Sequence, residues 1–305
     1  SSEPDFRTVR SGGPETNAGP RRSINLVAPG SQIELLDPDG RRRVASGTSF
    51  ASPHVVGAIA LLQQLADQQF RAGLVNFPLE GRKPMVMKAV LLNSADKLLD
   101  TGDGLNLGMR RTLLDESNST WTASDAYQDR QIPLHKELGT GHLNVYRAYE
   151  QMVAGAFSPD QAIPAVGWNY ATLATPAASS DQPPTGQVHD YLFEQPLAAG
   201  SYLSATLTWE RVVDLVDTNN NGLYDLGETF SDRGLNNVDL FLLPADEDDI
   251  ANSLWSSESQ VDSMEHIFYK IPQTGRYKLR VVFRQQVHDE ATQPYALAWW
   301  AAPAP

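Results

Sequence analysis

Residues 47–57 of this chain read GTSFASPHVVG and place a serine where a glycine-led turn opens a long apolar helix. From residue 49 to about residue 70, apolar side chains recur at helical spacing, with Ala and Gly packed between them. A helix N-terminus offers unpaired backbone N–H groups and a partial positive charge, which suit the oxyanion of an acyl-transfer intermediate. Ser49 is therefore a candidate nucleophile, and we expect its helix to be buried on most sides.

The neighbouring sequence predicts three more elements. Residues 24–28 should form a short apolar strand, and apolar spacing predicts a second helix over residues 84–99. Asn144 can cap a third helix that runs to Ala154.

Three further motifs flank the helix of Ser49: NLVAPG at residues 25–30, KAVLLNSA at residues 88–95 and GTGHLN at residues 139–144. Together with the serine stretch, they resemble the subtilisin-like serine proteases, or subtilases, over roughly the first half of the chain. The resemblance implies an α/β fold, here a partial subtilisin-like parallel sheet with helices. It also implies a serine endopeptidase that hydrolyses peptide bonds through an acyl-enzyme on Ser49.

The same resemblance requires an aspartate and then a histidine upstream of the serine. No histidine precedes Ser49, and the only aspartate before Asp37 is Asp5, with neither in the family's Asp motif. Asn17 lies too close to Ser49 to match the asparagine that completes the family's oxyanion hole. We therefore expect the C-terminal part of a catalytic domain, and we predict that the isolated chain is inactive.

The six histidines of the chain offer no obvious substitute base. His54 lies five residues beyond Ser49 on the same expected helix, which turns it away from the hydroxyl. His142 belongs to the Gly-Thr-Gly-His turn, where we expect a structural role. The other four lack neighbours that favour a catalytic role: His135, His189, His266 and His288.

After residue 155 the pattern changes to alternation with a period of two. Apolar residues alternate along residues 203–209, 238–242, 277–283 and 295–299. Short strands with one buried face favour a β-sandwich. Strings within these strands look like the jelly-roll domains that follow many subtilase catalytic domains. We expect two domains, with residues 1–157 the nucleophile-bearing part and residues 158–305 an all-β jelly-roll sandwich.

Residues 217–228 read DTNNNGLYDLGE and match the spacing of an EF-hand-like calcium loop. The alternative is a solvated, Asn-rich hairpin loop. Strand-like flanks at residues 212–216 and 238–242 argue against a helix-loop-helix, so we expect a loop-borne structural calcium ion. Asp214 and Asp232 are possible extra partners. The expected ligands are Asp217, Asn219, Asn221, the backbone carbonyl of Leu223, Asp225 and Glu228.

The amino-acid composition limits the classes of molecule that the chain can bind. The 305 residues carry 24 basic and 37 acidic side chains, a formal charge of -13, which disfavours nucleic acid and anionic membrane surfaces. The chain lacks cysteine and has no long uncharged apolar run, so we expect no membrane span and no disulfide. We expect a polypeptide substrate and a secreted or extracytoplasmic location. The first four residues do not resemble a signal peptide, so any such signal lies outside this sequence or was removed.

An incomplete parallel sheet leaves apolar surfaces uncovered. We expect them to be covered by an N-terminal protease fragment, by a second copy of the chain, or by a rearrangement of the first domain. Two other functions stay open at this point. One is a calcium-stabilised β-sandwich that acts as an interaction module, and the other is a catalytically dead protease homologue.

Overall fold

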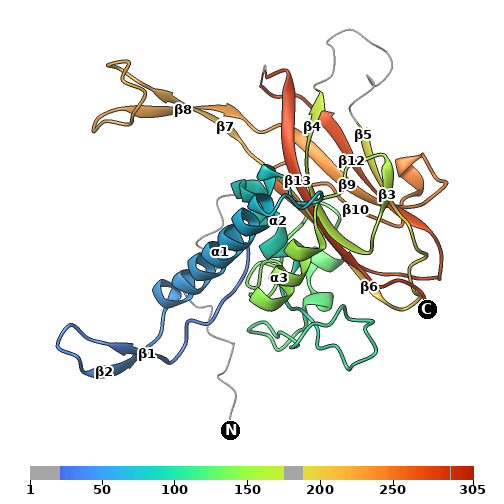
Figure 1. The fold of residues 1–305 in the computed structure, drawn as a ribbon, viewed down its shortest axis with the longest axis horizontal. Helices are drawn as coiled ribbons and strands as arrows, with labels where there is room; N and C mark the ends of the chain where they lie inside the picture. The colour runs from blue at the N-terminus through green and yellow to red at the C-terminus, as the bar shows by residue number, and fades with distance from the viewer. Residues whose placement is uncertain (1–20, 175–187, 289) are drawn as a thin grey trace.

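The computed structural model describes residues 21–174, 188–288 and 290–305 and gathers three helices against one face of a β-sheet (Figure 1). These helices are α1 (Thr48–Arg71), α2 (Pro84–Asn93) and α3 (Val145–Ala154). Helix α2 contacts strands β6 and β13, and α3 contacts β4. Four short 3-10 helices complete the helical elements of the described residues: η3 (Leu79–Arg82), η4 (Trp121–Ala123), η5 (Asp125–Tyr127) and η6 (Ile250–Asn252).

The strands after residue 160 form two larger sheets. The five-stranded sheet has the order β10-β9-β12-β5-β3, and the four-stranded sheet has the order β11-β6-β13-β4. All neighbours in these sheets are antiparallel except the parallel pair β3 and β5. The bounds are β3 (Gln161–Ile163), β4 (Val166–Ala174), β5 (Val188–Phe193), β6 (Tyr202–Trp209), β9 (Asn237–Pro244), β10 (Trp255–Ser257), β11 (Met264–Lys270), β12 (Tyr277–Gln285) and β13 (Thr292–Ala301). The four alternating segments of the sequence therefore form strands, as predicted.

Strand β13 is buried on both faces, and alternate residues serve different cores. Tyr295, Leu297 and Trp299 join a large apolar cluster with residues of both sheets. Ala296 and Ala298 point to the other face and join the cluster formed by the three helices. Since successive side chains of a strand point to opposite faces, the large residues fill the space between the sheets and the small alanines admit α2.

Strand β6 shows the same division with polar residues on its helix-facing side. The hydroxyl of Ser204 donates to Asn93 Oδ1 at 2.9 Å, and that of Thr208 donates to the carbonyl of Met85 at 3.0 Å. These contacts attach both ends of α2 to the sheet. The helical and the β-rich regions therefore share a core, and the expected division after residue 157 stays a prediction.

The parallel sheet expected in the first region is not formed by the described residues. Its two strands, β1 (Ile33–Leu36) and β2 (Arg42–Ala45), make an antiparallel hairpin. The expected strand at residues 24–28 makes only bridges, antiparallel from Leu26 to Gly139 and parallel from Val27 to His142. A parallel sheet needs further strands beside that segment, and the described part of the chain supplies none. The α/β character is thus confirmed only in part.

The helix boundaries agree with the sequence at two helices and differ at the third. Helix α1 covers the expected residues, and Asn144 caps α3 by accepting a hydrogen bond from the backbone N–H of Arg147. Helix α2 ends at Asn93, although apolar spacing favoured a helix to residue 99. The backbone of Asp96 instead exchanges hydrogen bonds of 2.8 and 2.9 Å with His142. This long-range pairing ends the helix.

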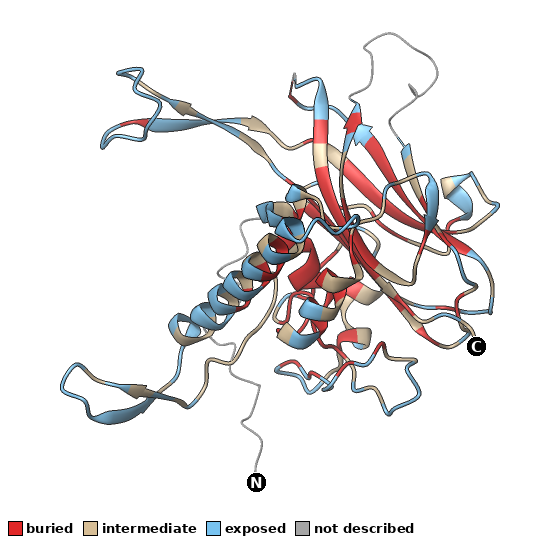
Figure 2. Ribbon diagram, in the orientation of Figure 1, coloured by how far each residue is buried: buried red, intermediate tan, exposed pale blue. Residues whose placement is uncertain are grey.

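Burial separates the molecule into a covered body and three projecting segments (Figure 2). The expectation that α1 is buried on most sides is wrong, because four of its 24 residues are buried and all four belong to residues 58–66. Val56 is 61% exposed and Leu61 is 59% exposed. The β1–β2 hairpin and the hairpin of β7 (Val212–Val216) and β8 (Thr229–Gly234) also project from the body. None of the described helices is long and apolar enough to cross a membrane.

Candidate active site

Ser49 is the second residue of α1 and is exposed, at the end of the helix that projects from the body (Figures 1 and 2). The helix begins after Gly47, whose carbonyl accepts the backbone N–H groups of Phe50 at 3.1 Å and Ala51 at 3.3 Å. Within the described residues, the backbone N–H groups of Thr48 and Ser49 donate to no acceptor. Free N–H donors beside an accessible hydroxyl suit an acyl-transfer nucleophile.

The turn before Ser49 is fixed by a close approach of two glycines. The backbone N–H of Gly47 donates to the carbonyl of Gly30 at 2.7 Å. A side chain at Gly30 would place its Cβ 2.8 Å from the Gly47 oxygen and 3.0 Å from the Ala51 Cβ. Glycine is therefore required at position 30, and the NLVAPG motif supports the serine turn through this contact.

The GTGHLN turn holds the segment that leads to Gly30. The backbone N–H of Thr140 donates to the carbonyl of Asn25 at 2.8 Å, and that of Leu143 donates to the carbonyl of Val27 at 2.8 Å. Gly139 has φ 57°, and a Cβ there would lie 2.2 Å from the Asn25 oxygen. The GTGHLN turn therefore positions the NLVAPG segment, and the NLVAPG segment in turn contacts the turn that precedes Ser49.

The two histidines nearest to the sequence motifs have structural roles. His54 lies on the exposed surface of α1, and its Nδ1 lies 2.9 Å from the Phe50 carbonyl of the preceding turn. His142 belongs to the GTGHLN turn and its side chain is buried, with Nδ1 2.9 Å from the Leu143 carbonyl. Burial, with the Arg111 charge nearby, lowers the pKa of His142 to about 4. A buried imidazole that resists protonation is a poor proton acceptor.

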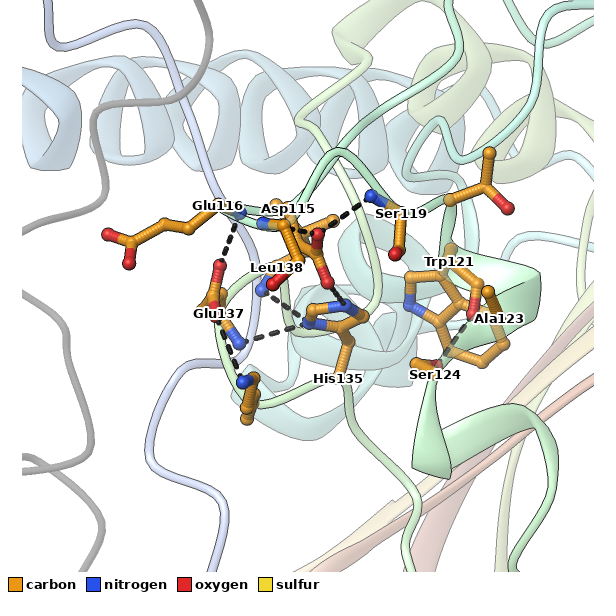
Figure 3. Close-up of polar contacts among 12 residues, drawn as sticks. Asp115, Glu116, Ser119, Trp121, Ala123, Ser124, His135, Glu137 and Leu138 are labelled. Carbon is orange, nitrogen blue, oxygen red and sulfur yellow. Dashed lines mark hydrogen bonds and ion pairs between the residues drawn. The ribbon is translucent and has the colours of Figure 1, made fainter.

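Within the described residues, Asp115 and His135 form an aspartate–histidine pair that no sequence motif marks (Figure 3). Asp115 Oδ2 lies 3.6 Å from His135 Nε2. The other ring nitrogen, Nδ1, accepts the backbone N–H groups of Glu137 at 3.0 Å and Leu138 at 3.2 Å. Because Nδ1 already accepts two backbone N–H groups and Nε2 faces the Asp115 carboxylate, neither ring nitrogen is available to accept a serine proton. Nineteen residues separate the two side chains in the sequence and no motif joins them, so the sequence gave no signal for this pair.

Of the remaining histidines, His189 lies on β5 and His266 on β11, whereas His288 is buried in the segment that follows β12. His189 Nδ1 lies 2.6 Å from the Tyr295 hydroxyl, and His266 Nδ1 lies 2.8 Å from the Thr206 hydroxyl. Burial lowers the pKa of both groups. In the described ranges, no hydrogen bond or ion pair joins Ser49 to a histidine or an aspartate. Asp5 lies outside these ranges, and the absence of a triad from the chain stays a prediction.

The expected calcium loop forms the tip of the β7–β8 hairpin. Its backbone folds around the side chain of Asp217, the first residue of the loop. Asp217 accepts backbone N–H groups from Asn220 at 2.6 Å and from Gly222 at 2.7 Å. These donors, that of Gly222 above all, lower the pKa of the Asp217 carboxyl. At the other end, Glu228 accepts the N–H groups of Asp225 at 2.9 Å and Thr218 at 2.8 Å, which lower its pKa as well.

The middle of the loop brings three of the expected ligands together. The side-chain amides of Asn219 and Asn221 donate to Asp225 Oδ2 at 2.6 and 2.7 Å. Asp214 and Asp232 point instead to arginines, with Arg233 at 3.4 Å and Arg211 at 2.8 Å. In the described part of the chain, no three His, Cys, Asp or Glu side chains are arranged to hold a metal ion. Any ion in this loop therefore depends on the asparagine and backbone oxygens.

Comparisons with known proteins support a subtilase relationship for the first third of the chain. A sequence model of the Subtilase family matches residues 2–110. The chain is 38% identical over 82 residues to the intracellular serine protease of Paenibacillus polymyxa, which is 27% of this chain and 24% of that protein. It is 36% identical over 81 residues to proteinase T of Parengyodontium album, 27% of each protein.

A third relative is the major intracellular serine protease of Bacillus subtilis, 40% identical over 53 residues and 17% of each protein. The chain thus spans about a quarter or less of the length of these relatives. The expectation of a secreted or extracytoplasmic protein is wrong by this measure, because two of the relatives are named as intracellular proteases. The sequence held no signal that separates the secreted from the intracellular members of such a family.

Proposed function

We propose that this chain carries the nucleophile-bearing part of a subtilisin-like serine endopeptidase and that it works inside the cell. The observation that carries the proposal is the exposed Ser49 at the N-terminus of α1, within the region that matches the Subtilase family. A buried hydroxyl or an unfolded residue 49 would have argued against a peptidase. The intracellular assignment rests on the names of two relatives.

The chemistry requires one group that the described residues do not supply. Ser49 Oγ would attack the scissile carbonyl carbon, the amine would leave, and water would hydrolyse the resulting ester. The free N–H groups at the start of α1 would stabilise the oxyanion. The hydroxyl proton must pass to a base, and we propose a histidine, oriented by an aspartate, from outside these residues. The isolated chain is then inactive, since loss of a triad member forfeits several orders of magnitude in rate.

The exposed apolar face of α1 supports the same conclusion from packing. Val56 and Leu61 are exposed among the described residues and lie on α1, the helix that also carries Ser49. We propose that a polypeptide which covers this face, either an N-terminal protease fragment or a second copy, completes the fold. An N-terminal fragment that brings an aspartate and a histidine would meet both needs at once.

We propose that the β-rich region is a jelly-roll β-sandwich and that residues 217–228 bind calcium. Two mainly antiparallel sheets with one shared apolar cluster support the first statement. The second is supported by the all-oxygen donor set of Asp217, Asp225 and Glu228 with Asn219, Asn221 and the Leu223 carbonyl. Each asparagine amide can present oxygen instead of nitrogen after a half turn of its terminal group. When bound, calcium would supply charge that holds the hairpin tip together, with no role at Ser49.

A second candidate function is an interaction module, either calcium-stabilised or derived from a dead protease. The observation that favours it is the β7–β8 hairpin, where Leu223, Tyr224, Leu226 and Phe230 are all more than half exposed. Tyr224 and Phe230 stack with their ring centroids 5.5 Å apart. Such an apolar tip would suit contact with another protein.

A fluorophosphonate probe separates these functions, because it labels an activated serine rapidly and an unactivated one slowly or not at all. We expect slow labelling of the isolated chain and none in the Ser49→Ala variant. The coding sequence immediately upstream should then be read for Asp-Ser/Thr-Gly and His-Gly-Thr motifs, and the extended protein labelled in parallel. Rapid, Ser49-dependent labelling of the extended protein supports the peptidase. Equal, slow labelling of both proteins would support the interaction module.

A further inference from the structure

A pocket of about 280 Å³ lies where the first turn of α2 meets the end of β6. Pro84 and Met85 form an apolar part of its lining, while Lys88, one turn further along α2, contributes an ammonium group. Ser263, which precedes β11, contributes a hydroxyl. The pocket lies beside the seam between the helices and the sheet, and its lining includes none of the residues that hold the Ser49 turn.

The Lys88 side chain is partly buried. Among the described residues, no hydrogen bond or ion pair engages it. The buried lysine of β12 differs, because Lys278 Nζ lies 2.7 Å from Asp248 and 3.1 Å from Asp190. Burial, followed by the nearby Arg21 charge, lowers the pKa of Lys88. A partly buried lysine that makes no direct contact with an acceptor is uncommon, since the lost hydration is normally replaced by a hydrogen bond.

The nearby carboxylates of Asp262 and Glu210 favour the charged form of Lys88, but within the described residues neither makes a hydrogen bond or ion pair with it. Asp262 accepts the backbone N–H of Arg22 at 3.2 Å and the hydroxyl of Ser259 at 2.9 Å. Arg211, which also lines the pocket, is held by Asp232 at 2.8 Å. Glu210 lines the pocket and is exposed.

We propose that this pocket binds a carboxylate group, with Lys88 as its counter-ion and Ser263 as a hydrogen-bond donor. The Ser263 hydroxyl has no partner among the described residues and is free to donate. Glu210 at the rim disfavours a doubly charged anion such as phosphate, and the apolar part of the lining at Pro84 and Met85 accepts a short hydrocarbon segment. The ligand is therefore a singly charged carboxylate with a small apolar part, such as a free short-chain acid or the C-terminus of a peptide.

Site-resolved acetylation of lysines at neutral pH tests the proposal in the intact chain. Butyrate is compared with chloride at equal ionic strength, and exposed Lys270 of β11 is the internal control. At four-fifths occupancy we expect butyrate to slow the acetylation of Lys88 about fivefold and to leave Lys270 unchanged. An acetylated tripeptide with a free C-terminus and its C-terminal amide distinguish the two sources of carboxylate. Protection by the peptide acid and not by the amide assigns a peptide end, and protection by butyrate alone assigns a small acid.

Equal Lys88 reactivity in butyrate, peptide acid and chloride would overturn the proposal, as would equal protection by the peptide amide. Stronger protection by inorganic phosphate than by butyrate would also contradict it. A Ser263→Ala variant should weaken the protection and leave Lys88 reactivity in chloride unchanged. These measurements do not involve Ser49, so their failure leaves the proposed peptidase function untouched.

Discussion

Helices α1 and α2 come from the same motif-rich region, yet one is uncovered and the other is enclosed. Seven of the ten residues of α2 are buried, whereas four of the 24 residues of α1 are. The two helices differ in burial because they pack against different amounts of the chain. Helix α2 lies on β6 and β13 of this chain, while the half of α1 that carries Ser49 extends past the body. Both helices show helical spacing of apolar residues. This spacing identifies the apolar face of each helix, but it does not show whether another segment of the chain packs against that face.

The largest expected effect contrasts two adjacent leucines of α1. Leu62 is 1% exposed within the helical cluster, and Leu61 is 59% exposed. Leu62→Ala should lower the free energy of unfolding by about 2–5 kcal/mol, because it removes buried apolar volume and leaves a cavity. Leu61→Ala should change it by about 0.5 kcal/mol or less. Urea denaturation of both variants measures the contrast, and equal losses would mean that Leu61 is covered in solution.

Sequence reasoning succeeded where local pattern and packing agree. Strands β6, β9, β12 and β13 follow from alternation, and the Asn144 cap follows from residue type. It failed where a distant segment decides the outcome. The early end of α2 depends on the pairing of Asp96 with His142, 46 residues away, and no local signal marks it.

The same limit applies to the candidate site. Ser49 was predicted from its motif because the turn and the helix are local. The role of Gly30 as a support was only implicit, since its contact with Gly47 exists only in three dimensions. The Asp115–His135 pair and the pocket at Lys88 likewise arise from long-range packing.

A second prediction concerns the pH dependence of stability at His142, whose backbone pairs with Asp96 just after α2. His142 has a pKa of about 4 in the folded protein, compared with about 6.5 in an unfolded chain. Above pH 6.5 neither state binds the proton, and this group costs no stability. As pH falls from about 6.5 to about 4, only the unfolded state gains the proton, so the free energy of unfolding drops by roughly 3 kcal/mol.

Denaturation of the wild type and of a His142→Gln variant across this range isolates the contribution of one imidazole. The difference between their free energies of unfolding should shrink as pH falls, because the variant has no proton to bind at this position. A difference that stays constant from pH 7 to pH 4 would show that His142 titrates normally.

A third prediction contrasts the β7–β8 hairpin with the enclosed strand β12. Calcium at a hundredfold excess over its dissociation constant should stabilise the closed loop by about 2.7 kcal/mol. Hydrogen exchange of the hairpin amides should slow accordingly, and exchange in β12 should not change. Glu228→Gln should weaken the effect of calcium, whereas Asp232→Asn, on the same hairpin but paired with Arg211, should preserve it. Exchange rates that do not respond to calcium would leave the loop as a solvated turn.

The smallest expected change in stability accompanies a large expected change in association. Val56→Glu places a charge on the uncovered face of α1, where no described residue packs tightly against it, so the free energy of unfolding should change by about 0.5 kcal/mol or less. The same charge should reduce binding of a hydrophobic dye and self-association, measured by fluorescence and light scattering, since both require an apolar surface. Gln131→Glu is the matched control, because it adds the same charge at an exposed polar position outside α1. A wild-type chain that is a stable monomer and binds no dye would mean that the face is already covered, and the contrast between α1 and α2 would then disappear.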